Sequence, residues 1–201
     1  MRLDGDQYEG VAEEIRSSLK VRRSEFIAIA FPIDGEEKFH AVLDELKKEM
    51  FDAVHHCWAF RLIAGETVVD RSSDAGEPSG TAGRPILQAI EDADLFDSAV
   101  VVVRYFGGVK LGTGGLARAY RDAARQVLRE ARIRRTILYD HIECEPGFES
   151  MNLVYRLVEP PDVVLEEEHF EPEPRLVLQV RRSITERIVR SLVESRVRVK
   201  D

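Results

Sequence analysis

The sequence predicts an α+β protein of two domains, and three patterns in its 201 residues support that prediction. A run of valines at 98–103 is typical of a strand buried on both faces of a sheet. Amphipathic helical periodicity appears at 36–50 and again at 116–131. After a polar stretch the alternation of strands and helices restarts, so we expect domains at 1–134 and 135–201.

The N-terminal domain is expected to place helices on a mixed sheet. Residues 25–33 (EFIAIAFPI) predict a strand, because β-branched and aromatic residues are dense there. Asp34 then offers an N-cap to the helix at 36–50. Residues 55–63 (HHCWAFRLI) predict a second strand, whose successive side chains point to opposite faces of the sheet.

The C-terminal domain is expected to be ferredoxin-like, because its elements follow the order β-α-β-β-α-β. The expected strands are 136–144, 162–170, 175–181 and a short one at 197–199, and the expected helices are 148–158 and one that ends near 194.

Composition limits the function classes. Hydrophobic residues make up 44% of the chain and charged residues 33%, which is globular composition. The formal charge of −8 excludes a general polycation, so any nucleic-acid surface must be a local patch. No apolar run approaches the ~18 residues of a membrane helix, and the first ten residues lack the layout of a secretory signal. The only cysteines, Cys57 and Cys144, favour a reducing compartment, so we expect a cytoplasmic protein without a membrane partner.

The segment 72–85 (SSDAGEPSGTAGRP) is rich in glycine and precedes a short predicted helix. Two interpretations stay open: free backbone amides and Arg84 form an anion cradle, or glycine only permits tight turns. Asp74 and Glu77 resemble an acid–base or metal pair, although such carboxylates more often bond backbone amides or an arginine. The motif positions here are Asp74, Gly76, Glu77, Gly80, Thr81 and Gly83.

The segment 101–120 (VVVRYFGGVKLGTGGLARAY) reads as strand, glycine loop and helix. Gly107 and Gly108 turn the chain, and Thr113 is a candidate N-cap for the long helix. This layout suits phosphate binding, although neither the P-loop nor the GxGxxG spacing is present.

Five arginines recur at intervals of three or four along that helix, which aligns their guanidinium groups on one side. We expect this side to contact phosphates or RNA, because arginine suits planar phosphate and base groups. The alternative is a solvated face whose arginines pair with Asp122 and Glu130. The helix residues concerned are Thr113, Gly114, Gly115, Arg118, Arg121, Arg125, Arg129 and Arg132, joined by Lys110, Arg84 and Arg104.

Candidate catalytic and metal-binding residues are few. His55, His56 and Cys57 are adjacent on a strand, so their side chains cannot converge on one ion. No serine or cysteine lies in a nucleophile motif. We therefore expect no metal, no cofactor and no catalytic residue, and an enzyme is less favoured than a binding protein.

The glycine-rich segments at 73–85 and 101–120 together closely resemble the IMPACT family, including its bacterial YigZ branch. Residues 22–30 (RRSEFIAIA) and 53–62 (AVHHCWAFRL) also look like strands of that family, so the match covers about 20–131. The resemblance implies an N-terminal domain similar to domain IV of elongation factor G and a C-terminal domain similar to its domain V. It also implies a link to translation, since eukaryotic members act in translational control. It supplies no catalytic residues.

The leading hypothesis is a non-enzymatic protein that contacts RNA or the ribosome, with a translation-related protein as a further partner. The first alternative is an enzyme or sensor for a small phosphorylated ligand held at the glycine-rich loops. The second is a protein–protein adaptor that docks through the C-terminal sheet.

Overall fold

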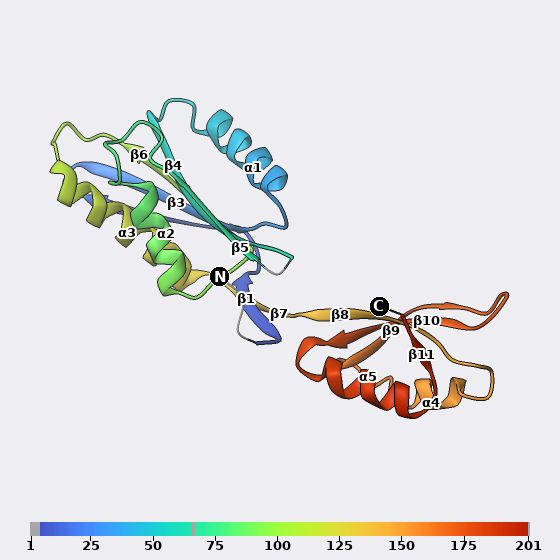
Figure 1. Ribbon diagram of the computed structural model, residues 1–201. Coiled ribbons are helices and arrows are strands. Elements are labelled where there is room, and N and C mark those ends of the chain that lie inside the picture. Colours follow the sequence, from blue (N-terminus) through green and yellow to red (C-terminus); the bar gives the residue numbers. More distant parts are fainter. Residues whose placement is uncertain (1–4, 66, 201) are drawn as a thin grey trace. The chain divides into compact units, whose positions relative to one another are not determined.

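The computed structural model describes residues 5–65 and 67–200, which divide into two compact units (Figure 1). The first unit contains Glu9–Thr136, and the second contains 137–200 together with the described residues before Glu9. Within the described part of the chain, none of the helices combines the length and apolar character that crossing a bilayer requires.

The first unit is built on a five-stranded sheet in the order β2-β3-β6-β4-β5. Its strands are β2 (Ile15–Val21), β3 (Ser24–Pro32), β4 (His55–Ala64), β5 (Thr67–Ser73) and β6 (Ser98–Tyr105). All four pairings between neighbouring strands of this sheet are antiparallel, so the prediction of a mixed sheet is wrong. The valine run suggested a partly parallel sheet, but β6 lies between β3 and β4 and runs opposite to both.

Helices cover both faces of this sheet, which explains why its central strand is uniformly apolar. Helix α1 (Glu36–Glu49) packs on one face, where its Phe39 lies in a core with Val101 and Val103. Helices α2 (Gly83–Asp92) and α3 (Gly112–Glu130) cover the other face, where Val100 and Val102 lie. Alternate valines of β6 therefore belong to two different cores.

Two predicted helix caps are wrong. Gly35 is the N-cap residue of α1, and Asp34 instead pairs with Lys38 at 3.1 Å. Leu111 is the N-cap residue of α3, and Thr113 lies inside its first turn. Neither helix has a side-chain cap. The N-cap position falls one residue after Asp34 in α1 and two residues before Thr113 in α3, so neither polar side chain occupies it.

Several strands fall outside the sequence predictions. β2 and β5 form the two edges of the large sheet, while β1 (Gln7–Val11) and β7 (Ile133–Ile137) form a separate two-stranded sheet. The polar stretch near 134 is thus a strand rather than a linker. Both edge strands carry polar or charged side chains on their exposed face, so neither forms a continuous apolar run like that of β6.

The second unit has the predicted ferredoxin-like order of elements. It contains β8 (Tyr139–Glu145), α4 (Met151–Tyr155), β9 (Val163–His169), β10 (Arg175–Arg181), a short 3₁₀ turn at Arg182–Ile184, α5 (Thr185–Glu194) and β11 (Arg198–Val199). Its antiparallel sheet has the order β11-β8-β10-β9, and Leu176, Leu178 and Leu192 are central to the core. The helix expected at 148–158 is real but shorter.

The close approach of two backbones at Gly107 generates a stability prediction. A Cβ added to Gly107 would lie 1.8 Å from the Arg23 carbonyl oxygen. We expect Gly107→Ala to lower the free energy of unfolding by at least about 2 kcal/mol in denaturant titrations. Gly114→Ala is the control: Gly114 is helical and has open space around its Cβ position, so alanine should raise stability by about 0.5–1 kcal/mol. Equal changes in the free energy of unfolding at both positions would contradict the close approach of the Gly107 and Arg23 backbones.

Candidate nucleic-acid interface

A buried carboxylate joins the two glycine-rich segments. Glu77 Oε1 accepts hydrogen bonds from Arg104 Nη1 at 2.6 Å and from Tyr120 Oη at 2.8 Å. Glu77 lies between β5 and α2, Arg104 on β6 and Tyr120 on α3. The side chains of Glu77 and Arg104 are less than one tenth exposed. This cluster fixes the 74–82 loop against the sheet and the long helix.

Aromatic rings complete the surroundings of Arg104. Its guanidinium carbon lies 5.7 Å from the ring centre of Phe26 and 5.4 Å from that of Phe106. Such contacts stabilise a cation held away from water. The charge of Arg104 is therefore balanced within the protein. The sequence predicted that Arg104 contacts phosphate, but its side chain is buried and paired with Glu77 rather than free at the surface.

Asp74 occupies the helix N-terminus that was a candidate anion cradle. Its carboxylate accepts backbone N–H bonds from Gly80, Ala82 and Gly83 at 2.8–2.9 Å. Desolvation raises the pKa of Asp74, but these three donors outweigh it and lower the pKa below its usual value. The chain's own carboxylate thus takes these amides, and the cradle interpretation is wrong for this segment.

The other motif positions of the first segment shape the loop. Gly76 and Gly80 have φ values of 89° and 75°, which favour glycine, and Thr81 Oγ1 donates to the Pro78 carbonyl at 2.6 Å. Gly83 lies so close to Ser73 that an added Cβ would be 2.7 Å from its backbone. These residues are structural, as the tight-turn interpretation predicted.

The N-terminus of α3 differs from that of α2. No side chain caps it, and its first turn contains no acidic residue. Gly112 has φ 71° and leads into a turn with exposed Thr113 and Gly114. An uncapped helix N-terminus carries partial positive charge and free N–H donors. The second glycine-rich segment predicted a glycine loop that leads into a helix capped by Thr113; the loop and helix are present, and the cap is not.

Arginines from two helices surround a hollow of about 340 Å³, which we call the basic hollow. Its lining residues are Gly80, Arg84, Pro85, Gln88, Gly114, Ala117, Arg118 and Arg121. Arg118 is exposed, and Nε of Arg121 has no hydrogen-bond partner. Arg84 lies 3.7 Å from Glu91, a loose exposed pair. The structure therefore brings together three of the predicted arginines.

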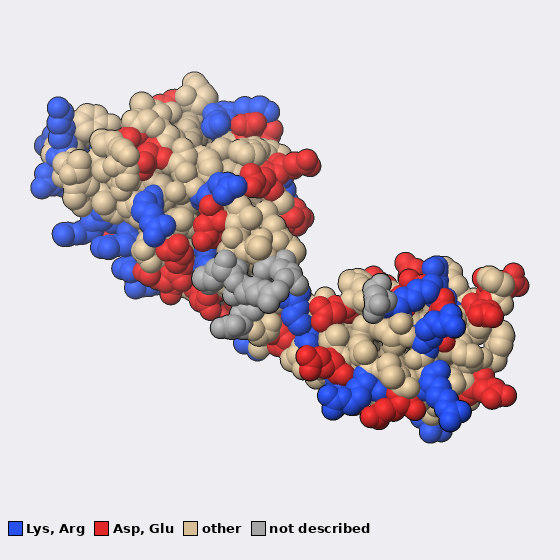
Figure 2. Space-filling view, viewed as in Figure 1, with Lys and Arg blue, Asp and Glu red and all other residues tan. Residues whose placement is uncertain are grey.

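The rest of the arginine face is only partly neutralised. Arg125 pairs with Asp92 of α2 at 2.5 Å, and this arginine lowers the pKa of Asp92. Arg132 lies 3.3 Å from Glu13, and Arg129 has no carboxylate partner among residues 5–65 and 67–200. Asp122 and Glu130 are not the partners, so that alternative is wrong in its details. Figure 2 shows basic side chains along the edge of the first unit that α3 forms.

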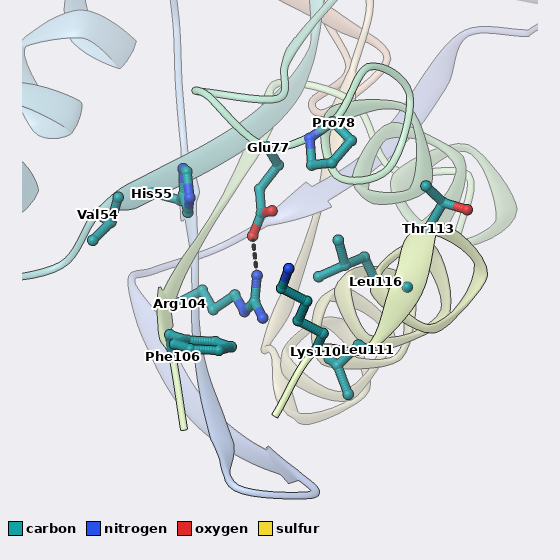
Figure 3. A pocket seen from close by; sticks show the side chains of 11 residues that line it. Val54, His55, Glu77, Pro78, Arg104, Phe106, Lys110, Leu111, Thr113 and Leu116 are labelled. Carbon is teal, nitrogen blue, oxygen red and sulfur yellow. Dashed lines mark hydrogen bonds and ion pairs between the residues drawn. The ribbon is translucent and has the colours of Figure 1, made fainter. Parts of the chain in front are cut away.

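A second hollow, of about 510 Å³, lies where β4 begins and β6 ends, and we call it the sheet-end pocket (Figure 3). Glu77, Arg104, Lys110 and Thr113 line it together with apolar side chains. Gly108, with φ 81°, turns the chain between β6 and Lys110. A Cβ added to Gly115 would lie 3.1 Å from the Leu111 Cβ, so this position is tight for a larger residue. Most of the predicted site residues thus divide between two hollows that share the first turn of α3, whereas Gly115, Arg125 and Arg129 line neither of the two.

Sequence reasoning missed Tyr120 as a partner of Glu77, and it missed the lining residues His55, Phe106 and Gln88. The sequence signal that could have indicated Phe106 is its place, because an aromatic residue stands there between the end of a predicted strand and a glycine pair. His56 and Cys57 are buried sheet residues, as predicted, and burial raises the pKa of Cys57 to about 12. The described residues hold no group of three or more metal-ligating side chains.

Asp74 should make stability depend on pH in acid. Because its folded pKa is lowered, its contribution is complete above the unfolded pKa of about 4 and is lost as the pH falls through the folded value. We expect Asp74→Asn to cost about 1–2 kcal/mol at pH 7 and to flatten this part of the pH–stability curve. Denaturant unfolding between pH 2 and pH 7 measures both effects. An unchanged curve would contradict the capping role.

The Glu77 cluster gives a second stability prediction. Glu77→Gln leaves Arg104 buried without its counter-charge, so the free energy of unfolding should fall by about 3–5 kcal/mol. Tyr120→Phe removes one neutral donor and should cost only about 1–2 kcal/mol. Denaturant titration of both variants tests the ranking, and a harmless Glu77→Gln would refute the role of the cluster.

Comparison with known proteins agrees with the motifs. The Impact N-terminal domain matches residues 22–128. An IMPACT family member of Haemophilus influenzae is 35% identical over 87% of this chain and 85% of its own. IMPACT family member YigZ of Escherichia coli is 38% identical over 63% of each chain. A crystal structure of a hypothetical protein is similar with TM-score 0.68, 26% identity and 96% coverage of both chains. The chain belongs to the IMPACT family.

Proposed function

We propose that this protein binds structured RNA, free or in the ribosome, through the basic hollow and the arginine face of α3. One observation carries the proposal: Arg84, Arg118 and Arg121 come from two helices to one hollow, beside a helix N-terminus without a cap. Guanidinium forks and free N–H groups are the donors that phosphate oxygens accept.

The contrast with the rest of the molecule supports a specific surface. The chain carries a formal charge of −8, so nonspecific attraction to a polyanion is weak. Acidic residues neutralise Arg125 and approach Arg84, whereas no carboxylate in the described part of the chain lies within ion-pair distance of Arg118 or Arg121. The charge of Arg121 contributes to the lowered pKa of Asp92, but Asp92 forms its ion pair with Arg125. A local positive hollow on an acidic protein favours a shaped target, such as folded RNA, over any nucleic acid.

Family membership adds support for a role in translation. The IMPACT resemblance implies similarity to domains IV and V of elongation factor G and a function linked to translational control. The similarity to these two domains remains a prediction. A ribosomal or translation-related target would suit both this prediction and the basic hollow, and a cytoplasmic location follows from that target.

The experiment is an RNA- and ribosome-binding assay with a matched charge-reversal control. Arg118→Glu combined with Arg121→Glu removes the two unpaired arginines of the hollow. Arg187→Glu combined with Arg190→Glu makes the same change in net charge on exposed positions of α5. We expect the first pair to weaken binding at least tenfold and to reduce its salt dependence, and the control pair to change affinity less than twofold.

Two results would contradict the proposal. Wild-type protein that binds neither RNA nor ribosomes at low salt would refute it, because phosphate contacts are strongest there. Equal losses in both double variants would show that net charge, and not the basic hollow, controls binding.

A further inference from the structure

The sheet-end pocket combines an apolar wall with donors for an anion. Strand β4 contributes His55, β6 and the loop after it contribute Arg104 and Phe106, and Leu111 and Leu116 lie on the α3 side (Figure 3). Its volume of about 510 Å³ is in the range of sites for small molecules. Phe106 is 57% exposed, which leaves a large apolar area of this side chain in contact with solvent.

The polar groups of the pocket have unused capacity. Arg104 donates one side-chain hydrogen bond, to Glu77, and its Nε has no acceptor although the side chain is only 9% exposed. A guanidinium has five N–H donors, so this one is far from saturated. Lys110 is exposed and has no carboxylate partner in the described ranges, and Thr113 adds a hydroxyl at the uncapped first turn of α3.

The charge balance of the pocket favours an anionic occupant. Glu77 neutralises Arg104, and Lys110 then leaves one positive charge at the rim. An apolar side chain from a protein partner would pack against the apolar wall of the pocket. It would leave the donors of Arg104, Lys110 and Thr113 without acceptors, which is unfavourable once water is excluded. A planar ring that carries a phosphate satisfies both parts.

We propose that the sheet-end pocket holds one unstacked nucleotide. The base lies against Phe106 and the apolar wall, and its phosphate faces Lys110, Thr113 and the first turn of α3. Aromatic side chains hold unpaired bases by stacking, and this contact tolerates different bases. The inference deepens the proposed function, because it names the part of an RNA that this pocket takes.

The position of the pocket beside the basic hollow supports this assignment. Gly112 and Thr113 line the pocket, and Gly114 lines the basic hollow. The 74–82 loop contributes Pro78 to the sheet-end pocket and Gly80 to the basic hollow. Phosphates on the basic hollow and a base in the pocket would therefore be neighbours along one strand.

The test compares Phe106→Ala with Phe148→Ala, which truncates a 70% exposed phenylalanine of the second unit. Three probes are titrated: a single-stranded RNA hexamer, the matching duplex and adenosine 5′-monophosphate. We expect Phe106→Ala to weaken the hexamer about tenfold or more and the duplex less than twofold, with no effect from Phe148→Ala. The thermal unfolding of each variant shows whether it is folded. A hexamer with 5-iodouridine should photocross-link to Phe106 or His55.

Each outcome has a defined meaning. If wild-type protein binds the hexamer but Phe106→Ala does not weaken it and the cross-link lies elsewhere, this inference fails while the proposed function stands. If only the mononucleotide binds, and Phe106→Ala weakens it, the pocket takes a free nucleotide and not part of an RNA strand, so this inference fails. If none of the probes binds, this inference is refuted, and the proposed function is decided separately by the assay with structured RNA and ribosomes.

Discussion

The carboxylate of Glu77 is the contact on which the arrangement of the first unit depends. Without its counter-ion, Arg104 would be a buried cation between two aromatic rings, and desolvation would strongly oppose folding. With it, the 74–82 loop is held against β6 and α3. This loop contributes Pro78 to the sheet-end pocket and Gly80 to the basic hollow, so one buried ion pair positions the surfaces on which both proposals depend.

The two helix N-termini of this region show how the chain separates structure from binding. At α2 the amides of Ala82 and Gly83 donate to Asp74, and these bonds help to lower the pKa of that carboxyl. At α3 no carboxylate is available in the first turn, and glycines keep side chains away from the amides. The same physical feature therefore stabilises the fold at one helix and remains open at the next.

Much of the fold could be predicted from sequence because burial leaves a clear pattern. The valines of β6 and the apolar face of α3 indicated a core on both sides of a sheet, and the element order indicated a ferredoxin-like second unit. Edge strands such as β5 escaped prediction, because their exposed faces carry charged residues such as Asp70 and Arg71. Strand direction escaped as well, because a valine run is equally apolar in parallel and antiparallel sheets.

The site was predicted less well than the fold. Spacing predicted five arginines on one side of the long helix, but Arg132 lies beyond the end of α3, and partners from other elements are invisible to spacing. Asp92 of α2 neutralises Arg125, and Glu77 neutralises Arg104, across 33 and 27 residues of sequence. Within the described residues, the arginines of this face that form no ion pair are Arg118, Arg121 and Arg129, and they could be identified only once the fold was known.

The most direct measurement is an NMR titration of the isotope-labelled full chain with a structured RNA, followed at the backbone amides. Our account predicts that the largest changes in amide chemical shift occur in the first turn of α3, from Gly112 to Gly115, and in the 74–82 loop. Changes confined to the second unit, or spread evenly over exposed amides, would contradict it.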